Sequence, residues 1–164
     1  MDYYENVVFN YLRADRAVFV NTECCIQINP ADNPDACGPH WYCDAVAADF
    51  RSKTIFLCEI SYSSRLADLT KRLKDWQENW EGLCRALARD SFLREGWAVR
   101  AWLFVPEDHL PLLLKRLAQI ENQHPLKFAP RVTTLEMVQP WRFNSFNRKG
   151  EEPKPAIIPT VLQN

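Results

Sequence analysis

Glycine is scarce in this sequence, at 4 of 164 residues. Loops that cradle phosphate groups need several glycines at fixed spacing, because only glycine lets the backbone approach a phosphate closely. The sequence contains neither a G-x-G-x-x-G fingerprint nor a glycine-rich phosphate loop, and it shows no internal repeat or low-complexity tract. A dinucleotide-binding function therefore has no support.

Long apolar runs and a dominant charge are also absent. No stretch reaches the roughly 18 apolar residues that a membrane-spanning helix needs. The start, MDYYENVVFN, has no basic segment before its apolar residues and does not resemble a secretory signal. With 20 basic and 21 acidic residues, the net charge of -1 argues against a strong, indiscriminate binder of nucleic acid. We expect one globular domain in the cytoplasm, without membrane association.

Six cysteines are present, and without a secretory signal we expect them to be reduced thiols. Cys37, His40 and Cys43 in CGPHWYC suggest half of a zinc site, which Cys24 or Cys25 would complete. The spacing matches no standard pairing of zinc ligands. Small buried thiols are the favoured interpretation, and zinc is the alternative.

Hydrophobic periodicity predicts eight elements. Apolar residues at helical spacing indicate helices over 2–13, 63–91 and 107–122. Runs rich in β-branched and aromatic residues indicate strands over 17–28, 41–50, 54–63, 97–105 and 131–138. The order αβββαβαβ predicts a single α/β domain with a central mixed sheet of about five strands, because a hairpin is antiparallel whereas crossover helices join parallel strands. We expect this domain to cover 1–139 and a proline-containing extended tail to cover 140–164.

Two acidic residues interrupt apolar strands: Asp44 in WYCDAVAADF and Glu59 in FLCEIS. A buried carboxylate needs a partner charge, a proton or a metal ion. An even hairpin loop, over 50–53 or 51–54, sets Asp44 opposite Glu59 or Ser61 on one face of the sheet, whereas an odd loop sets the two acids on opposite faces. Two carboxylates within about 5 to 8 Å would favour a divalent ion such as Mg²⁺.

The order of elements over roughly 2–138, with these two acids, resembles the PD-(D/E)xK nuclease superfamily, whose fold is also called restriction-endonuclease-like. Glu5 on the first helix matches a position where many members carry an additional acid. The resemblance implies that Asp44 and Glu59, with the backbone carbonyl of Ile60 and with Glu5, hold Mg²⁺ or Mn²⁺. It further implies that the metal activates water for cleavage of phosphodiester bonds, in DNA or, less expectedly, RNA.

The sequence departs from the family pattern at two positions. Cys43 stands in place of the motif's proline, and Ser61 stands in place of its lysine. Some members recruit a basic group from the next helix instead, and helical geometry favours Arg65 or Arg72 for that role. Arginine cannot act as a base at neutral pH, but its guanidinium can clamp a phosphate.

Structural alternatives stand beside each of these assignments. Glu59 would pair with Arg65 or Arg100, Asp44 would be a solvated hairpin residue, and Glu5 would be a first-turn acid favoured by the helix dipole. The chain would then be an inactive nuclease-fold module that binds nucleic acid or a protein. The segment PWRFNSFNRKG, which interleaves aromatic and basic residues, would contact a nucleic-acid strand, dock on a second subunit or a protein partner, or form a loosely ordered terminus.

Overall fold

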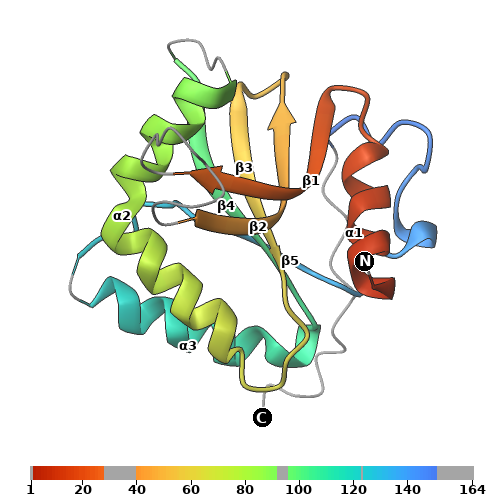
Figure 1. The fold of residues 1–164 in the computed structure, drawn as a ribbon. Coiled ribbons are helices and arrows are strands. Elements are labelled where there is room, and N and C mark those ends of the chain that lie inside the picture. Colours follow the sequence, from red (N-terminus) through yellow and green to blue (C-terminus); the bar gives the residue numbers. More distant parts are fainter. Residues whose placement is uncertain (1, 28–39, 92–95, 123, 151–164) are drawn as a thin grey trace.

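The computed structural model describes residues 2–27, 40–91, 96–122 and 124–150 (Figure 1). The order of helices and strands agrees with the prediction. The elements are α1 (Tyr3–Arg13), β1 (Val18–Gln27), β2 (His40–Asp49), β3 (Thr54–Ile60), α2 (Ala67–Ser91), β4 (Ala98–Val105), a short 3-10 helix η1 (Glu107–His109), α3 (Leu110–Glu121), β5 (Arg131–Thr134) and a second 3-10 helix η2 (Pro140–Arg142).

The strands form one mixed sheet of five strands in the order β1-β2-β3-β4-β5. β2 runs antiparallel to β1 and to β3, whereas β3, β4 and β5 are parallel to one another. The predicted single α/β domain with a mixed five-stranded sheet is therefore confirmed. The carboxyl ends of the three parallel strands meet along one edge of the sheet, which is where open α/β sheets usually bind ligands.

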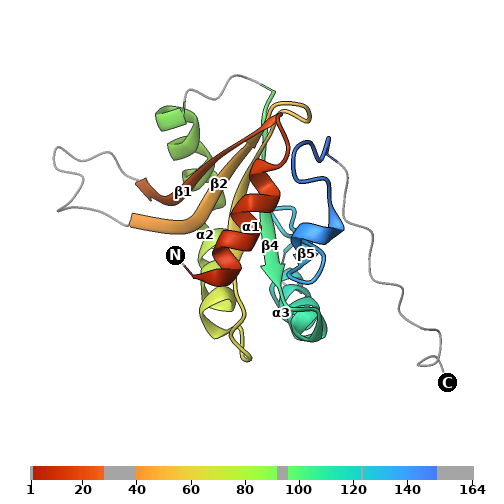
Figure 2. The ribbon, with the colours of Figure 1, turned by 90° about the vertical axis from the view of Figure 1, so that its right-hand side faces the viewer.

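Helices cover both faces of the sheet (Figures 1 and 2). α2 and α3 pack on one face, and α1 packs on the other together with the segment that follows β5. The predicted apolar stripe of α2 is buried, because residues at 3-4 spacing such as Leu69, Leu73 and Trp76 are at most 3% exposed. Burial of each such side chain contributes about 1.5 to 3 kcal/mol.

The start of α2 differs from the prediction. The helix begins at Ala67 rather than at position 63, because Leu66 has a φ of +48° and a Ser63–Leu66 turn closes with a backbone hydrogen bond of 3.1 Å. A positive φ cannot continue a right-handed helix. Arg65 therefore precedes the helix, so the argument from helical geometry that favoured Arg65 as the basic residue of the site does not apply to it. The last strand also ends early, at Thr134 rather than 138.

The described part of the predicted extended tail, 140–150, lies against α1. Arg148 is 3% exposed, and its Nε donates a hydrogen bond of 3.1 Å to the carbonyl oxygen of Tyr11. Its guanidinium lies 4.2 Å from the centre of the Tyr11 ring, and its backbone N–H donates to the carbonyl of Ala14. Up to Gly150 the segment is therefore packed on the domain.

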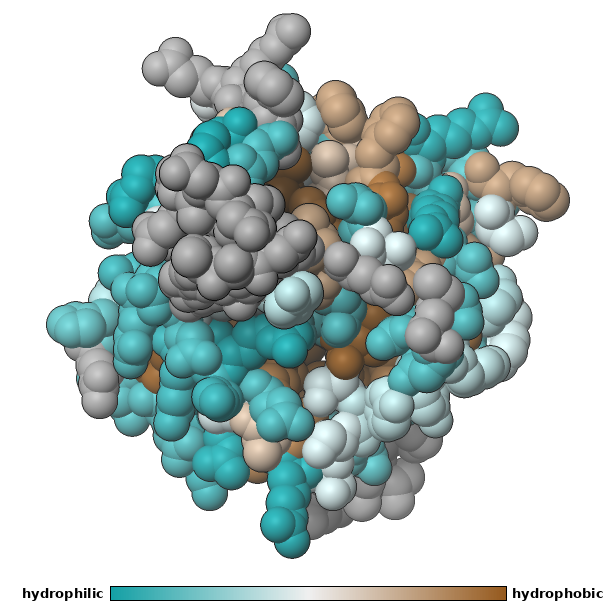
Figure 3. Space-filling model, in the orientation of Figure 1, coloured by the Kyte–Doolittle hydropathy of each residue, from teal (hydrophilic) through white to brown (hydrophobic). Residues whose placement is uncertain are grey.

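The surface carries exposed apolar side chains near one end of the sheet. Apolar side chains gather on the face shown in Figure 3 at the hairpin end of β2 and β3, where Phe19 and Phe50 are 65% and 56% exposed. None of the helices in the described ranges combines the length and apolar character that a membrane crossing requires.

Candidate functional site

The β2–β3 hairpin has the even loop that the site prediction required. Asp49 pairs with Thr54, so residues 50–53 form the loop, and the last pair of the ladder is Ala45 with Cys58. Extension of this register by one residue sets Asp44 opposite Glu59. The Asp44 side chain reaches across the end of the ladder, where its Oδ2 accepts a hydrogen bond of 2.6 Å from the backbone N–H of Ile60. The two acids therefore lie at the same place, at the carboxyl end of β3.

Glu59 is buried, at 4% exposed, between the sheet and α2. Its Oε2 accepts a hydrogen bond from Nη1 of Arg72, and the two groups form an ion pair whenever Glu59 is ionised. Its second oxygen, Oε1, is also buried and has no hydrogen-bond partner within the described part of the chain. A buried carboxylate oxygen without a partner carries a desolvation cost that a proton or a cation would relieve.

The electrostatics of this pair favour a bound proton or cation. Burial, followed by the charge of Asp44, raises the pKa of Glu59 to about 8 in spite of the hydrogen bond from Arg72. Burial also raises the pKa of Asp44, although the Ile60 N–H and Arg72 oppose that rise. Glu59 therefore holds a proton at neutral pH unless another cation takes its place.

The three arginines considered as partners of the acids differ in their contacts. Arg72 extends from α2 to Glu59 and keeps 36% of its side chain exposed, so it contacts both the buried acid and solvent. Arg65 is exposed before the start of α2. Arg100, considered as a structural partner of Glu59, instead donates to the carbonyl of Ala129 and lies 5.9 Å from the centre of the Phe56 ring. Arg72 is the arginine that the structure brings to the acids.

Glu5 has a structural role at the start of α1. Its Oε2 accepts a hydrogen bond of 3.0 Å from the backbone N–H of Asp2, while Asp2 Oδ1 accepts one of 2.8 Å from the N–H of Glu5. This capping box satisfies two backbone donors at the helix end. Burial is the main cause that raises the pKa of Asp44, and the charge of Glu5 adds to it.

The donor set for a metal ion is small. Over 2–27, 40–91, 96–122 and 124–150 no group of three or more His, Cys, Asp and Glu side chains lies close enough to hold a metal ion. Mg²⁺ binds in many sites through only one or two carboxylates, with water or other oxygens as the remaining ligands. Asp44, Glu59 and the carbonyl of Ile60 are compatible with that mode, and the unpartnered Oε1 of Glu59 is the oxygen best suited to it.

The suggested zinc site falls largely outside the described residues, because Cys37 and the side chains of His40 and Cys25 are not among them. The remaining two candidates pair across the strands: Cys24 faces Cys43 in the β1–β2 ladder, and Cys43 Sγ donates to the carbonyl of Cys24 at 3.9 Å. Both are free thiols. The hydrogen bond with Cys24 and burial raise the pKa of Cys43, which opposes the thiolate that zinc requires.

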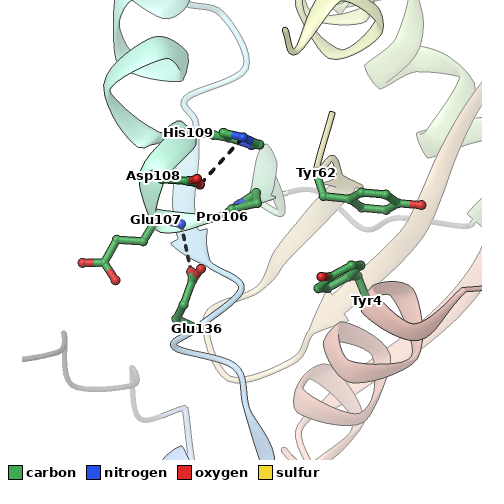
Figure 4. Close-up of a pocket in the computed structure, with 7 residues that line it drawn as sticks. All are labelled: Tyr4, Tyr62, Pro106, Glu107, Asp108, His109 and Glu136. Atoms are coloured by element: carbon green, nitrogen blue, oxygen red, sulfur yellow. Dashed lines mark hydrogen bonds and ion pairs between the residues drawn. The ribbon is translucent and has the colours of Figure 1, made fainter. Parts of the chain in front are cut away.

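Sequence reasoning missed a cavity of about 590 Å³ at the carboxyl ends of β3, β4 and β5 (Figure 4). The residues that line it are Tyr4, Tyr62, Pro106, Glu107, Asp108, His109 and Glu136. Tyr62 follows Glu59 by three residues, so the cavity lies beside the candidate site. The signal that would have found it is the position of these residues directly after predicted parallel strands.

Comparison with known proteins does not assign a family. No model of a known protein family matches the chain, and a search of curated proteins also finds no match.

Proposed function

We propose that this chain has the restriction-endonuclease-like fold of the PD-(D/E)xK superfamily and acts as a small metal-dependent nuclease on DNA. The element order and the sheet, in which β2 alone opposes the other strands, support the fold proposal. The observation that carries the function is the pair of acids at the end of β3, with one buried carboxylate oxygen of Glu59 left without a partner.

Mg²⁺ or Mn²⁺ is the cofactor of this proposal, held by Asp44, Glu59 and the carbonyl of Ile60. When bound, it would lower the pKa of a water molecule and polarise the phosphate. Asp44 is positioned for this by the N–H of Ile60, which occupies its Oδ2 and leaves its other oxygen for the ion. Glu59 must release its proton before it can serve as a ligand, because its pKa is about 8.

Arg72 takes the place of the motif's lysine in this proposal. One of its N–H groups fixes Glu59 Oε2, and a guanidinium has five N–H donors in all. The exposed part of the side chain leaves donors for the oxygens of a phosphate, so Arg72 would orient the substrate and balance its charge. Arg72 would not remove a proton from water, since guanidinium stays charged at neutral pH.

The alternative is an inactive module of the same fold that binds nucleic acid or a protein. The observation that favours it is the Glu59–Arg72 ion pair, which is a sufficient structural role for a side chain that is only 4% exposed. Glu5 likewise has a complete structural role in the capping box. Ser61 would then mark lost chemistry.

A cleavage assay tests the proposal. The full chain is incubated with supercoiled, linear and single-stranded DNA and with RNA, each with Mg²⁺, with Mn²⁺ and with a chelator. Activity that requires the metal and falls by orders of magnitude in Glu59→Gln and Asp44→Asn supports a nuclease, because these changes keep the side-chain shape while removing the charge that holds the ion. Activity that survives in both variants overturns the assignment, and no cleavage of any substrate favours the inactive module.

A further inference from the structure

The cavity beside the candidate site contains two exposed tyrosine rings. The centres of the Tyr4 and Tyr62 rings lie 4.8 Å apart with a tilt of 37°, and the residues are 39% and 48% exposed. The Tyr62 hydroxyl donates a hydrogen bond of 2.6 Å to Oδ2 of Asp2, which fixes the ring against α1. Each ring covers part of one face of the other, and the exposed remainder of this aromatic pair borders the cavity.

Carboxylates stand on the other side of the same cavity. Figure 4 shows Asp108 and Glu136, on the segments that follow β4 and β5, across the cavity from the two tyrosines, while the carboxylate of Glu107 points away. Glu136 is held by a hydrogen bond of 2.9 Å from the backbone N–H of Glu107, and Asp108 Oδ1 lies 3.7 Å from Nε2 of His109. Both acids are exposed, so each is available to a ligand.

The cavity continues into a second one of about 340 Å³, which shares Tyr4, Pro106 and Glu136 with it and extends to Trp141 and Arg142. Across both linings there are three acids, Glu107, Asp108 and Glu136, and one arginine. This charge would repel a phosphodiester backbone and attract a cation. Aromatic faces opposite carboxylates are the two features that recognise guanidinium and ammonium groups.

We propose that this cavity binds a basic segment of a protein partner, whose arginine or lysine side chain has the paired tyrosines on one side and the carboxylates of Asp108 and Glu136 on the other. The exposed parts of the Tyr4 and Tyr62 rings contact the cation, and the carboxylates accept its N–H groups. The second cavity takes the residues that flank this side chain. The proposal does not depend on nuclease activity, because none of its residues belongs to the acid pair at the end of β3.

Fluorescence anisotropy with the full chain tests the proposal. The probes are labelled peptides of alternating glycine and arginine, glycine and lysine, and glycine and glutamate, and a labelled oligothymidylate. We expect the two basic peptides to bind and the other probes not to bind. Glu136→Gln and Asp108→Asn should each weaken binding about threefold, and the double variant about tenfold. Glu136→Gln keeps an oxygen that accepts the N–H of Glu107, so the loop is preserved.

Two matched controls separate the site from bulk charge. Glu121→Gln makes the same charge change at the far end of α3, roughly 16 Å from Leu110, and should leave binding unchanged. Tyr62→Phe keeps the ring and should bind as the wild type does, whereas Tyr62→Leu should bind about threefold more weakly. Equal effects of Glu121→Gln and Glu136→Gln, no binding of either basic peptide, or tighter binding of oligothymidylate would each overturn the proposal.

Discussion

Nη1 of Arg72 on α2 donates a hydrogen bond to Oε2 of Glu59, thirteen residues earlier in the chain at the end of β3. Glu59 thus has a cation on one side and the carboxylate of Asp44 near it. Burial has the largest effect on the pKa of Glu59, which is raised to about 8 although the hydrogen bond and charge of Arg72 lower it. At neutral pH the carboxyl group of Glu59 therefore holds a proton, which a metal ion could displace to bind Glu59 or which simply lets the buried side chain support the fold.

The first prediction concerns the pH dependence of stability. Folded Glu59 keeps its proton up to about pH 8, whereas in the unfolded chain it releases the proton near the ordinary glutamate pKa of 4.5. The folded state binds more protons in that window, so the free energy of unfolding should decrease as pH rises from 4.5 to 8, by at most about 1.4 kcal/mol per pH unit. Urea unfolding across this range measures the slope.

Glu59→Gln should remove that slope, while Glu78→Gln, an exposed change on α2, should keep it. Near pH 6 the glutamine variant should be about as stable as the wild type, because glutamine still accepts the hydrogen bond from Arg72. A loss of roughly 3 to 5 kcal/mol at every pH would show instead that Glu59 is charged throughout and that its removal strands Arg72.

The second prediction concerns metal binding. Mg²⁺ or Mn²⁺ must displace the proton of Glu59, so millimolar metal should raise the melting temperature more at about pH 8.5 than at about pH 6. Removal of the metal with a chelator should reverse the rise. Asp44→Asn and Glu59→Gln should both abolish the response. A wild type that is indifferent to both metals at either pH would contradict the metal site.

The third prediction separates the two arginines. Arg72→Ala removes the donor to a buried carboxyl group and should cost about 1 to 2 kcal/mol of stability, at the lower end for charged hydrogen bonds because Arg72 is partly exposed. Arg65→Ala should change stability by less than about 0.5 kcal/mol, since Arg65 is exposed before α2. Chemical denaturation measures both values.

In a working nuclease Arg72→Lys should retain part of the cleavage activity that Arg72→Ala loses. An equal loss of cleavage activity in Arg65→Ala would refute the assignment of Arg72.

Sequence patterns predicted the features that depend on local periodicity. The 3-4 spacing of Leu69, Leu73 and Trp76 predicted α2 and its buried face, and alternation along β2 and β3 predicted that an even loop would set Asp44 opposite Glu59, although the choice between an even and an odd loop stayed open. These predictions succeeded because the period of a strand or helix fixes which side chains share a face. The chemistry of the pair is a separate question, and the roles of Asp44, Glu59, Arg65 and Arg72 in catalysis remain predictions.

The features that sequence patterns did not predict depend on contacts distant in the chain. Leucine is a good helix former, but Leu66 has a positive φ. α2 therefore begins only at Ala67, and Arg65 lies outside the helix. Arg148 lies in the segment predicted to be an extended tail, and its partner Tyr11 is 137 positions away. The cavity at Tyr4 and Tyr62 forms only where the ends of three strands meet α1. Local periodicity alone does not reveal such contacts, although the positions directly after predicted parallel strands point to the cavity.

The last prediction tests the packing of 140–150 on the domain. Arg148→Ala removes a hydrogen bond to the carbonyl of Tyr11 and the stacking of the guanidinium on the Tyr11 ring, and it takes one cation away from Asp15, whose Oδ2 lies 3.9 Å from Nη2 of Arg148. Because Arg148 is 3% exposed, we expect a loss of about 2 to 4 kcal/mol in the free energy of unfolding. Lys149→Ala, an exposed change one residue later, should cost less than about 0.5 kcal/mol. Calorimetry of the three proteins compares them directly, and equal melting temperatures would mean that this segment does not stabilise the fold.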